Sequence, residues 1–273
     1  MRIELTPVQY PVLSFLGKDV LEEARECLRL QFPEESRTIL DQFIFYDGVI
    51  KGSNIPGNIL LSRVSGIQLA YPSQLEHAVR ISPDYFKGTY EDTAFMLRED
   101  GDPNSSRNLI ARDLYRQLKK RGIKPTPENP ARISLAGTIL RSDRSMPLGI
   151  GYDITEETDV VQDSRFSYLN NERRFKITDE QGVPIFDSEG TRVFCTGQGG
   201  LGRFCLGRGL VLGSDWNWYR DLADSYAGGR VAVVENFPSG NLDEYLARLS
   251  EEKDRQIAEV DNRYEQAMAI MRG

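Results

Sequence analysis

Apolar residues recur with helical spacing along the end of the chain, from Asn241 to Gly273. They follow one another at steps of three, four and eight residues, which places them on one stripe of a helix. Glutamates precede arginines by four residues on the other side, in the order that stabilises a helix. The stripe consists of Leu242, Leu246, Leu249, Ile257, Val260, Tyr264, Met268 and Met271. This pattern predicts one amphipathic helix about 45 Å long.

A stripe of this kind is typical of a helix that docks against another surface. Lys253 and Gln256 interrupt its heptad seam, and the spacing fits a period of about 3.6 residues better than about 3.5. A coiled coil and packing on the protein's own body therefore both remain open. The residues predicted to form the interface are Leu246, Leu249, Ile257, Val260, Tyr264 and Met268.

Helical periodicity also marks two segments in the first half of the chain. Residues 18–45 are predicted to form a helical hairpin, with Pro33 at the break between two helices. Residues 105–122 are predicted to form a helix that ends on basic residues and Gly122. Between them, residues 55–98 mix short apolar runs with Gly, Pro and Ser and end in a predicted strand, Thr93 to Arg98.

Short strands and turns dominate the segment that follows three prolines at residues 125–130. Strands are predicted at residues 132–140, 148–154, 173–177, 183–186, 191–196, 206–212 and 230–234. The fold class is therefore α+β. Three regions are expected: residues 1–124 mixed and helix-rich, residues 131–237 β-rich, and residues 238–273 the long amphipathic helix.

Composition is that of an ordinary globular protein. Of 273 residues, 40% are hydrophobic and 27% are charged, with a net charge of −7. No apolar run reaches the length of about 20 residues that crosses a bilayer, so no membrane partner is expected. Cys27, Cys195 and Cys205 are an odd number without a zinc-type spacing, which favours free thiols. The expected location is the cytoplasm, or an intracellular or virion assembly.

The single histidine, His77, limits the chemistry that the sequence can support. Triads with a histidine base and multi-histidine metal sites depend on this residue or on more of its kind. No catalytic residue is assigned, and neither a cofactor nor a metal is expected. We interpret His77 as structural, because no partner motif accompanies it.

Glycines and arginines are concentrated in residues 197–209. Residues 197–202 match G-x-G-x-x-G after a predicted strand, but no helix follows, so a dinucleotide fold is disfavoured. The residues that could instead hold a phosphate or carboxylate are Gly199, Gly200, Gly202, Arg203 and Arg208. The preferred interpretation is a glycine-rich turn and bulge between crowded strands.

The helix predicted for residues 105–122, together with Lys124, carries seven basic residues against one aspartate. Its basic patch consists of Arg112, Arg116, Lys119 and Lys120. Such a patch can meet an acidic partner surface or nucleic acid, the latter being the less favoured partner in an acidic protein. A solvated helix face explains the pattern more simply.

Two further clusters have both a functional and a structural interpretation. Asp153, Glu156, Glu157 and Asp159 could bind a hard cation or act in acid–base chemistry, but exposed loop carboxylates are the preferred explanation. Trp216 and Trp218 share a face if they lie on a strand, where they form a core anchor or an interface hot spot.

These patterns support two functions. The first is a structural or assembly subunit that associates, through the C-terminal helix, with copies of itself or with another chain. The alternative is a phosphate- or nucleotide-handling enzyme that uses the loop at residues 197–209 as its anion cradle, with an acid from the 153–159 cluster. The alternative requires those distant segments to converge.

Overall fold

The computed structural model describes residues 12–14, 16–46, 48–103, 105–169, 173–214, 222–225 and 228–235. All of them belong to one unit, residues 11–235. The predicted C-terminal helix and its interface candidates (Leu246, Leu249, Ile257, Val260, Tyr264 and Met268) lie outside the described residues. Trp216 and Trp218 lie outside them as well.

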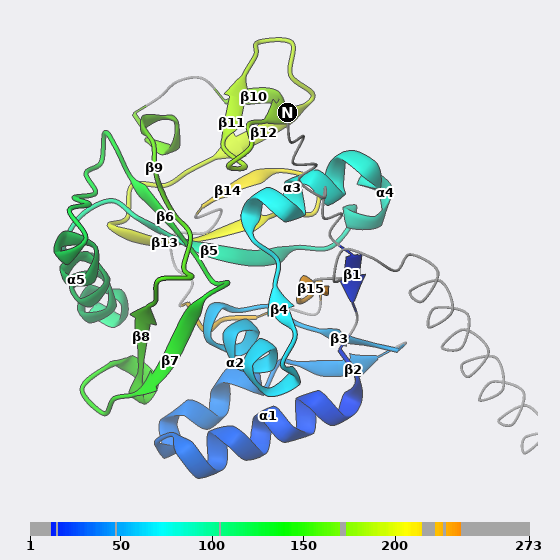
Figure 1. Ribbon diagram of the computed structural model, residues 1–273, viewed down its shortest axis with the longest axis vertical. Helices are drawn as coiled ribbons and strands as arrows, with labels where there is room; N and C mark the ends of the chain where they lie inside the picture. The colour runs from blue at the N-terminus through cyan, green and yellow to red at the C-terminus, as the bar shows by residue number, and fades with distance from the viewer. Residues whose placement is uncertain are drawn as a thin grey trace, which may run out of the picture. The chain divides into compact units, whose positions relative to one another are not determined.

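The fold is α+β, with its longer helices in the first half and a large mixed sheet (Figure 1). The helices are α1 (Lys18–Gln31), α2 (Ile55–Ser65), α3 (Pro72–Ile81), α4 (Pro83–Phe86) and α5 (Ser105–Lys120), with the 3-10 helices η1 (Glu34–Leu40), η2 (Pro147–Gly149) and η3 (Ser164–Phe166). The first strands are β1 (Val12–Ser14), β2 (Ile44–Tyr46), β3 (Val49–Lys51), β4 (Gln68–Leu69), β5 (Glu91–Leu97), β6 (Ala131–Ser134), β7 (Thr138–Ser142) and β8 (Ile150–Ile154). The remaining strands are β9 (Val160–Gln162), β10 (Arg174–Thr178), β11 (Pro184–Phe186), β12 (Arg192–Cys195), β13 (Leu201–Leu206), β14 (Leu212–Ser214) and β15 (Val233–Glu235).

Eight of the described strands form one sheet in the order β11-β10-β12-β14-β13-β5-β6-β9. Its pairs are antiparallel except for β12 with β14, which are parallel. A smaller sheet has the order β1-β15-β4, and β2-β3 and β7-β8 form two hairpins. No described helix is long and apolar enough to cross a membrane.

Strand β5 lies between β13 and β6 and is buried on both faces. Phe95 and Leu97 belong to the core that includes α1, α2 and α5, whereas Ala94 and Met96 belong to a second, phenylalanine-rich core. This explains why residues 94–97 of β5 form a continuous apolar run without alternating polar residues. Because β5 precedes the proline connector and β6 and β13 follow it, residues 1–124 and 131–237 share one sheet. The boundaries of the three regions stay a prediction.

Several predicted elements are present nearly as expected. Helix α5 begins at Ser105, and β5, β10, β11 and β12 lie within about one or two residues of their predicted bounds. The turn at residues 179–182 joins β10 to β11, with Gly182 at a φ of 74°. Apart from β5, which shows as an apolar run, these elements have one-sided burial or clear turn residues, so their pattern is visible in the sequence.

Three predictions need correction. The predicted helical hairpin is α1 followed by the 3-10 helix η1 and then by strand β2, with Pro33 capping η1. The strand predicted at residues 132–140 is two strands, β6 and β7, which are separated by a turn at Gly137 with a φ of 80°. The strand predicted at residues 206–212 is mostly the turn between β13 and β14, because the glycine-rich segment before it already belongs to the sheet.

Candidate functional site

The glycine-rich segment leads directly into strand β13. Gly199 and Gly200 precede the strand, and Gly202 lies within it. A Cβ atom on Gly200 would lie 1.8 Å from the carbonyl oxygen of Gly101, so only glycine allows the two backbones to approach this closely. The backbone contact therefore accounts for this glycine, as expected for a crowded turn between strands.

Side chains of the protein already bind the polar groups of this segment. The Nη1 atom of Arg98 donates to the carbonyl oxygen of Gly199 at 2.7 Å, and Nη1 of Arg107 donates to that of Leu201 at 2.9 Å. The carboxylate of Asp102 accepts the N–H of Leu201 at 2.8 Å. These bonds pair donors with acceptors and anchor the start of β13 to the end of β5, to Asp102 and to the first turn of α5.

The five residues predicted to hold an anion do not gather at one place. Gly199 and Gly200 lie at one end of β13 and Arg208 lies past the other, separated by a six-residue strand of about 20 Å. Arg208 is exposed in the turn after β13, where its guanidinium lies against Gly228. An anion site here stays a prediction, and it would have to form around Arg203 or Arg208 separately.

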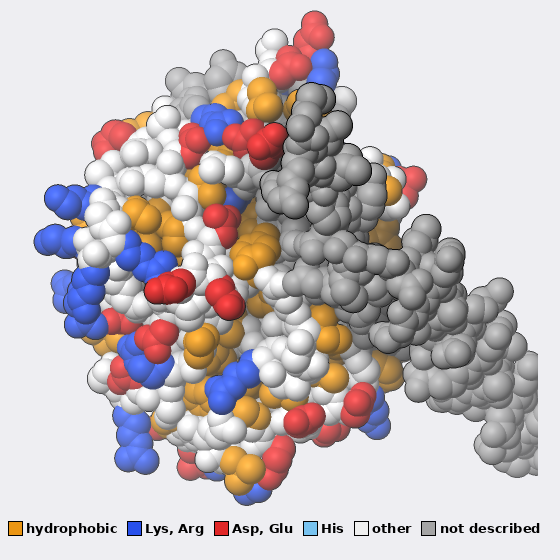
Figure 2. All heavy atoms as spheres, viewed as in Figure 1, with side chains coloured by type: hydrophobic (Ala, Val, Ile, Leu, Met, Phe, Trp, Pro, Cys, Tyr) orange, Lys and Arg blue, Asp and Glu red, His pale blue; other side chains and the backbone are white. Residues whose placement is uncertain are grey.

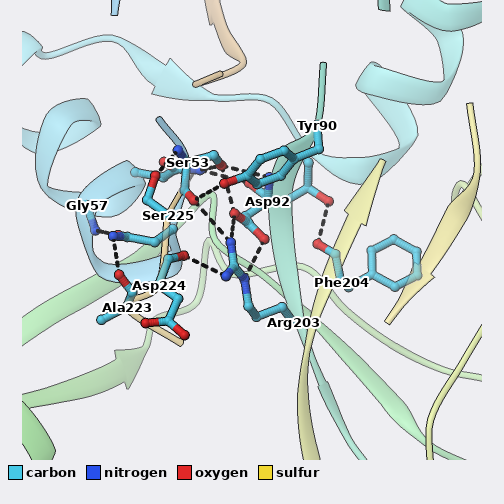
Figure 3. Close-up of polar contacts among 12 residues, drawn as sticks. Ser53, Gly57, Tyr90, Asp92, Arg203, Phe204, Ala223, Asp224 and Ser225 are labelled. Carbon is cyan, nitrogen blue, oxygen red and sulfur yellow. Dashed lines mark hydrogen bonds and ion pairs between the residues drawn. The ribbon is translucent and has the colours of Figure 1, made fainter. Parts of the chain in front are cut away.

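Arg203 lies at the centre of a buried polar network (Figure 3). Its Nε atom donates to Asp92 Oδ1 at 2.9 Å, and its Nη2 atom also bonds the Asp92 carboxylate. Nη2 donates to the carbonyl oxygen of Ser53 at 3.0 Å, and Nη1 to that of Asp224 at 2.6 Å. Burial alone lowers the pKa of Arg203, but the charge and hydrogen bonds of Asp92 outweigh burial and raise it above its ordinary value.

The Ser53 hydroxyl is the second node of this network. It donates to Asp92 Oδ2 at 2.8 Å and accepts from the N–H of Asp92 at 3.0 Å and from Asn58 Nδ2 at 3.0 Å. The backbone N–H of Ser53 donates to the Ser225 hydroxyl at 2.9 Å. These contacts occupy the donor and both acceptor positions of the Ser53 hydroxyl. The Ser53 hydroxyl therefore serves to link separate segments of the structure.

A second buried ion pair adjoins the first on strand β5. Arg230 donates from Nε to Glu91 Oε1 at 2.8 Å and stacks over the ring of Tyr85, 4.1 Å from its centroid. Glu91 is fully buried, and its Oε2 atom has no hydrogen-bond partner among the described residues. Burial raises the pKa of Glu91 above its ordinary value, although Arg230 acts in the opposite direction.

The predicted basic patch lies on the outer side of α5. Arg112, Arg116, Lys119 and Lys120 are all exposed, and we call these four residues the basic face. Lysine and arginine side chains gather at the edge of the molecule where Figure 1 places α5 (Figure 2). The four predicted residues are thus brought together on one surface.

The acidic residues at 153–159 have partners of their own. Asp153 bonds Arg141, and Asp159 lies 3.4 Å from Arg132, whereas Glu156 and Glu157 are exposed. Within the described part of the chain, no three His, Cys, Asp or Glu side chains are close enough to hold a metal ion. Neither that loop nor helix α3, which carries His77, is part of the Arg203 network.

Comparison with known proteins finds no match: no protein-family model, no curated protein and no solved structure matches this chain. The site is therefore defined by its geometry alone.

The partners of Arg203 could not be identified from sequence. Asp92 is 111 residues away from Arg203, and Ser53 is 150 residues away. One local signal existed for the same segment, because Asn54 precedes Pro56 and Gly57 in the pattern of a helix start. Asn54 indeed caps α2, accepting the N–H of Gly57 at 2.7 Å.

Proposed function

We propose that this chain is a structural or assembly subunit that associates with copies of itself, or with another chain, through residues 241–273. The observation that carries the proposal is the apolar stripe of eight residues along that segment of the sequence. A stripe of this width and length is stable in water only when another surface covers it.

A feature of the described body supports the same function. Ile44, Phe45 and Tyr46 form strand β2 and are 49%, 38% and 66% exposed, respectively. Three consecutive large apolar side chains on a two-stranded hairpin are unusual on a monomer and typical of contact surfaces. Among the described strands, β2 pairs only with β3.

The three cysteines are free, which supports a reducing setting such as the cytoplasm, or an intracellular or virion assembly. Cys195 and Cys205 pair with Gly213 from opposite sides of β14, so two strand spacings of about 4.8 Å each separate them. A disulfide bond would require their Cα atoms to lie closer than about 7 Å.

Mass measurement by light scattering on the full chain tests the proposal. The native chain is expected to exceed its monomer mass of 31.0 kDa, alone or with a partner chain. Replacing Leu249 and Val260 by aspartate places charge on the stripe and should return the mass to that of a folded monomer. The matched control places aspartate at Ala258 and Ala269, on the opposite side of the predicted helix.

The control variant should keep the native mass, because its changes avoid the stripe. Equal loss of association in both variants would mean that helix disruption, not the stripe, is responsible. A native chain that runs at 31.0 kDa and binds no other chain rejects the proposal.

A further inference from the structure

Helix α5 is held on the body by one side only. Ile110, Ala111, Leu114 and Leu118 are buried in the main core, and the helix packs against β5, β8 and β13. At about 100° per residue, the basic face is centred directly opposite these four residues. Its side chains therefore point away from the body.

The basic residues of this region differ in exposure: one is buried and bonded inside the protein, and the others lie on the surface. Arg107 is buried and donates to the carbonyl oxygen of Leu201. Arg121 and Lys124 are exposed, and Arg121 donates to the carbonyl oxygen of Ile154 at 2.7 Å. The surface that remains is the basic face extended by Arg121 and Lys124.

Most of this charge has no neutralising partner within the part of the chain that the structure describes. Among the described acidic side chains, none pairs with Arg112, Lys119, Lys120 or Lys124. Arg116 pairs with Asp113, but that carboxylate also accepts from Arg141.

The residue types on this face distinguish between classes of partner. Centres of protein–protein interfaces are depleted of lysine and built around buried aromatic or aliphatic side chains. On α5 the large apolar side chain described as exposed is Leu109, 43% exposed and one turn before Arg112. A row of lysines and arginines without an apolar centre fits phosphate groups better.

The length of the row also suits a nucleic-acid backbone. Arg112 and Lys120 are eight residues apart, which is about 12 Å along a helix. At about 3.4 Å per nucleotide, one strand presents three to four phosphates over that distance. We propose that the basic face of α5 binds the phosphate backbone of nucleic acid, independently of base sequence and of the C-terminal segment.

Fluorescence anisotropy with a labelled 20-base-pair DNA duplex and the matching RNA tests this proposal on the full chain. Binding should weaken steeply with salt, with a slope of log K against log salt of about −3 for three to four phosphates. The variant Lys119→Glu with Lys120→Glu reverses two of the cations. Its affinity at 50 mM salt should therefore fall by a factor of about ten or more.

The matched control is Lys18→Glu with Arg63→Glu, two exposed cations on α1 and α2. It changes the net charge of the chain by the same amount, so it should bind nearly as well as the native protein. Circular dichroism checks that both variants remain folded.

Three results would overturn the proposal. The native chain could fail to bind either nucleic acid at low salt, or both variants could weaken binding equally, which indicates a general charge effect. Binding of poly-glutamate or of phosphatidylserine vesicles, without binding of nucleic acid, would assign the face to an acidic protein or to a membrane surface instead. None of these results depends on whether the chain self-associates.

Discussion

Buried arginines hold the described body together through three kinds of partner. Arg203 and Arg230 pair with carboxylates on β5, and Arg98 donates to a backbone carbonyl and a threonine hydroxyl. Arg132 faces the rings of Phe166 and Phe204, 5.5 and 5.6 Å from their centroids, and burial lowers its pKa to about 10. Burial removes the hydration of these guanidinium groups, so each needs its partner to compensate.

Glu91 should make the stability of the protein depend on pH. Because burial raises its pKa above 4.5, the folded protein binds the proton more tightly than the unfolded chain. This contribution to stability is complete below pH 4.5 and is lost as the pH rises through the folded pKa. Relative to Glu91→Gln, which does not titrate, the native protein should therefore lose unfolding free energy as the pH rises from 4.5 towards 7.

Urea unfolding of both proteins across that pH range measures the difference. The exposed residue Glu34, replaced by glutamine, serves as the control for removing any carboxylate. A difference between native protein and Glu91→Gln that stays constant or grows with pH would contradict the assigned direction.

Among the helices, those that the sequence predicts well are buried on one side. Helix α5 shows its core-facing residues at helical spacing, and α1 does the same. Helix α2 has no such spacing, because Ile55 to Leu61 are buried without interruption. The sequence pattern did not show the start of strand β13, because glycines interrupt it. Gly200 is required there by its close contact with Gly101, about a hundred residues earlier in the chain.

The same distinction applies to the candidate site. The basic face belongs to one helix, so its members are neighbours in the sequence and their grouping is visible there. The Arg203 network joins segments that only the folded sheet brings together. Local spacing carries no information about such contacts.

Gly213 tests the parallel pairing of β12 with β14. A Cβ atom there would lie 1.9 Å from the carbonyl oxygen of Cys195 on the paired strand. Gly213→Ala should therefore force the strands apart and lower the unfolding free energy by about 1–3 kcal/mol or more. In Gly209→Ala the nearest atom is 3.8 Å away, so stability should change by less than about 0.5 kcal/mol.

Urea unfolding of the two variants gives the comparison. Both change glycine to alanine near the β13–β14 turn, so chain entropy affects them alike. If the variants were equally stable, β12 and β14 would not be paired in the register described.

Long-range polar contacts connect the start of helix α2 with a segment near the end of the described body. In the segment at residues 222–225, the backbone carbonyl of Ala223 accepts from the Asn54 side chain, and that of Asp224 accepts from Arg203. The hydroxyl of Ser225 accepts from the backbone N–H of Ser53. Strand β5 supplies the carboxylate that balances Arg203. The network thus ties the chain near its C-terminal strand β15 to helix α2 and to the central sheet.

Substitutions of Arg203 and Arg208 therefore distinguish a structural role of these arginines from a role in anion binding. Arg203→Ala leaves the Asp92 carboxylate buried without its counter-charge and should lower the unfolding free energy by about 3–5 kcal/mol. Arg208→Ala removes an exposed side chain and should change it by less than about 0.5 kcal/mol. A phosphate site built on both arginines requires a different result, with both variants stably folded and both binding phosphate more weakly.

Urea unfolding and calorimetric titration with inorganic phosphate, performed on the same three proteins, distinguish these outcomes. Arg203→Lys adds a control, because lysine keeps the charge but cannot form the paired hydrogen bonds to Asp92. Its stability should fall between those of the native protein and Arg203→Ala. If Arg203→Ala were as stable as Arg208→Ala, the network would not hold these segments together, and the arginine would be available to a ligand.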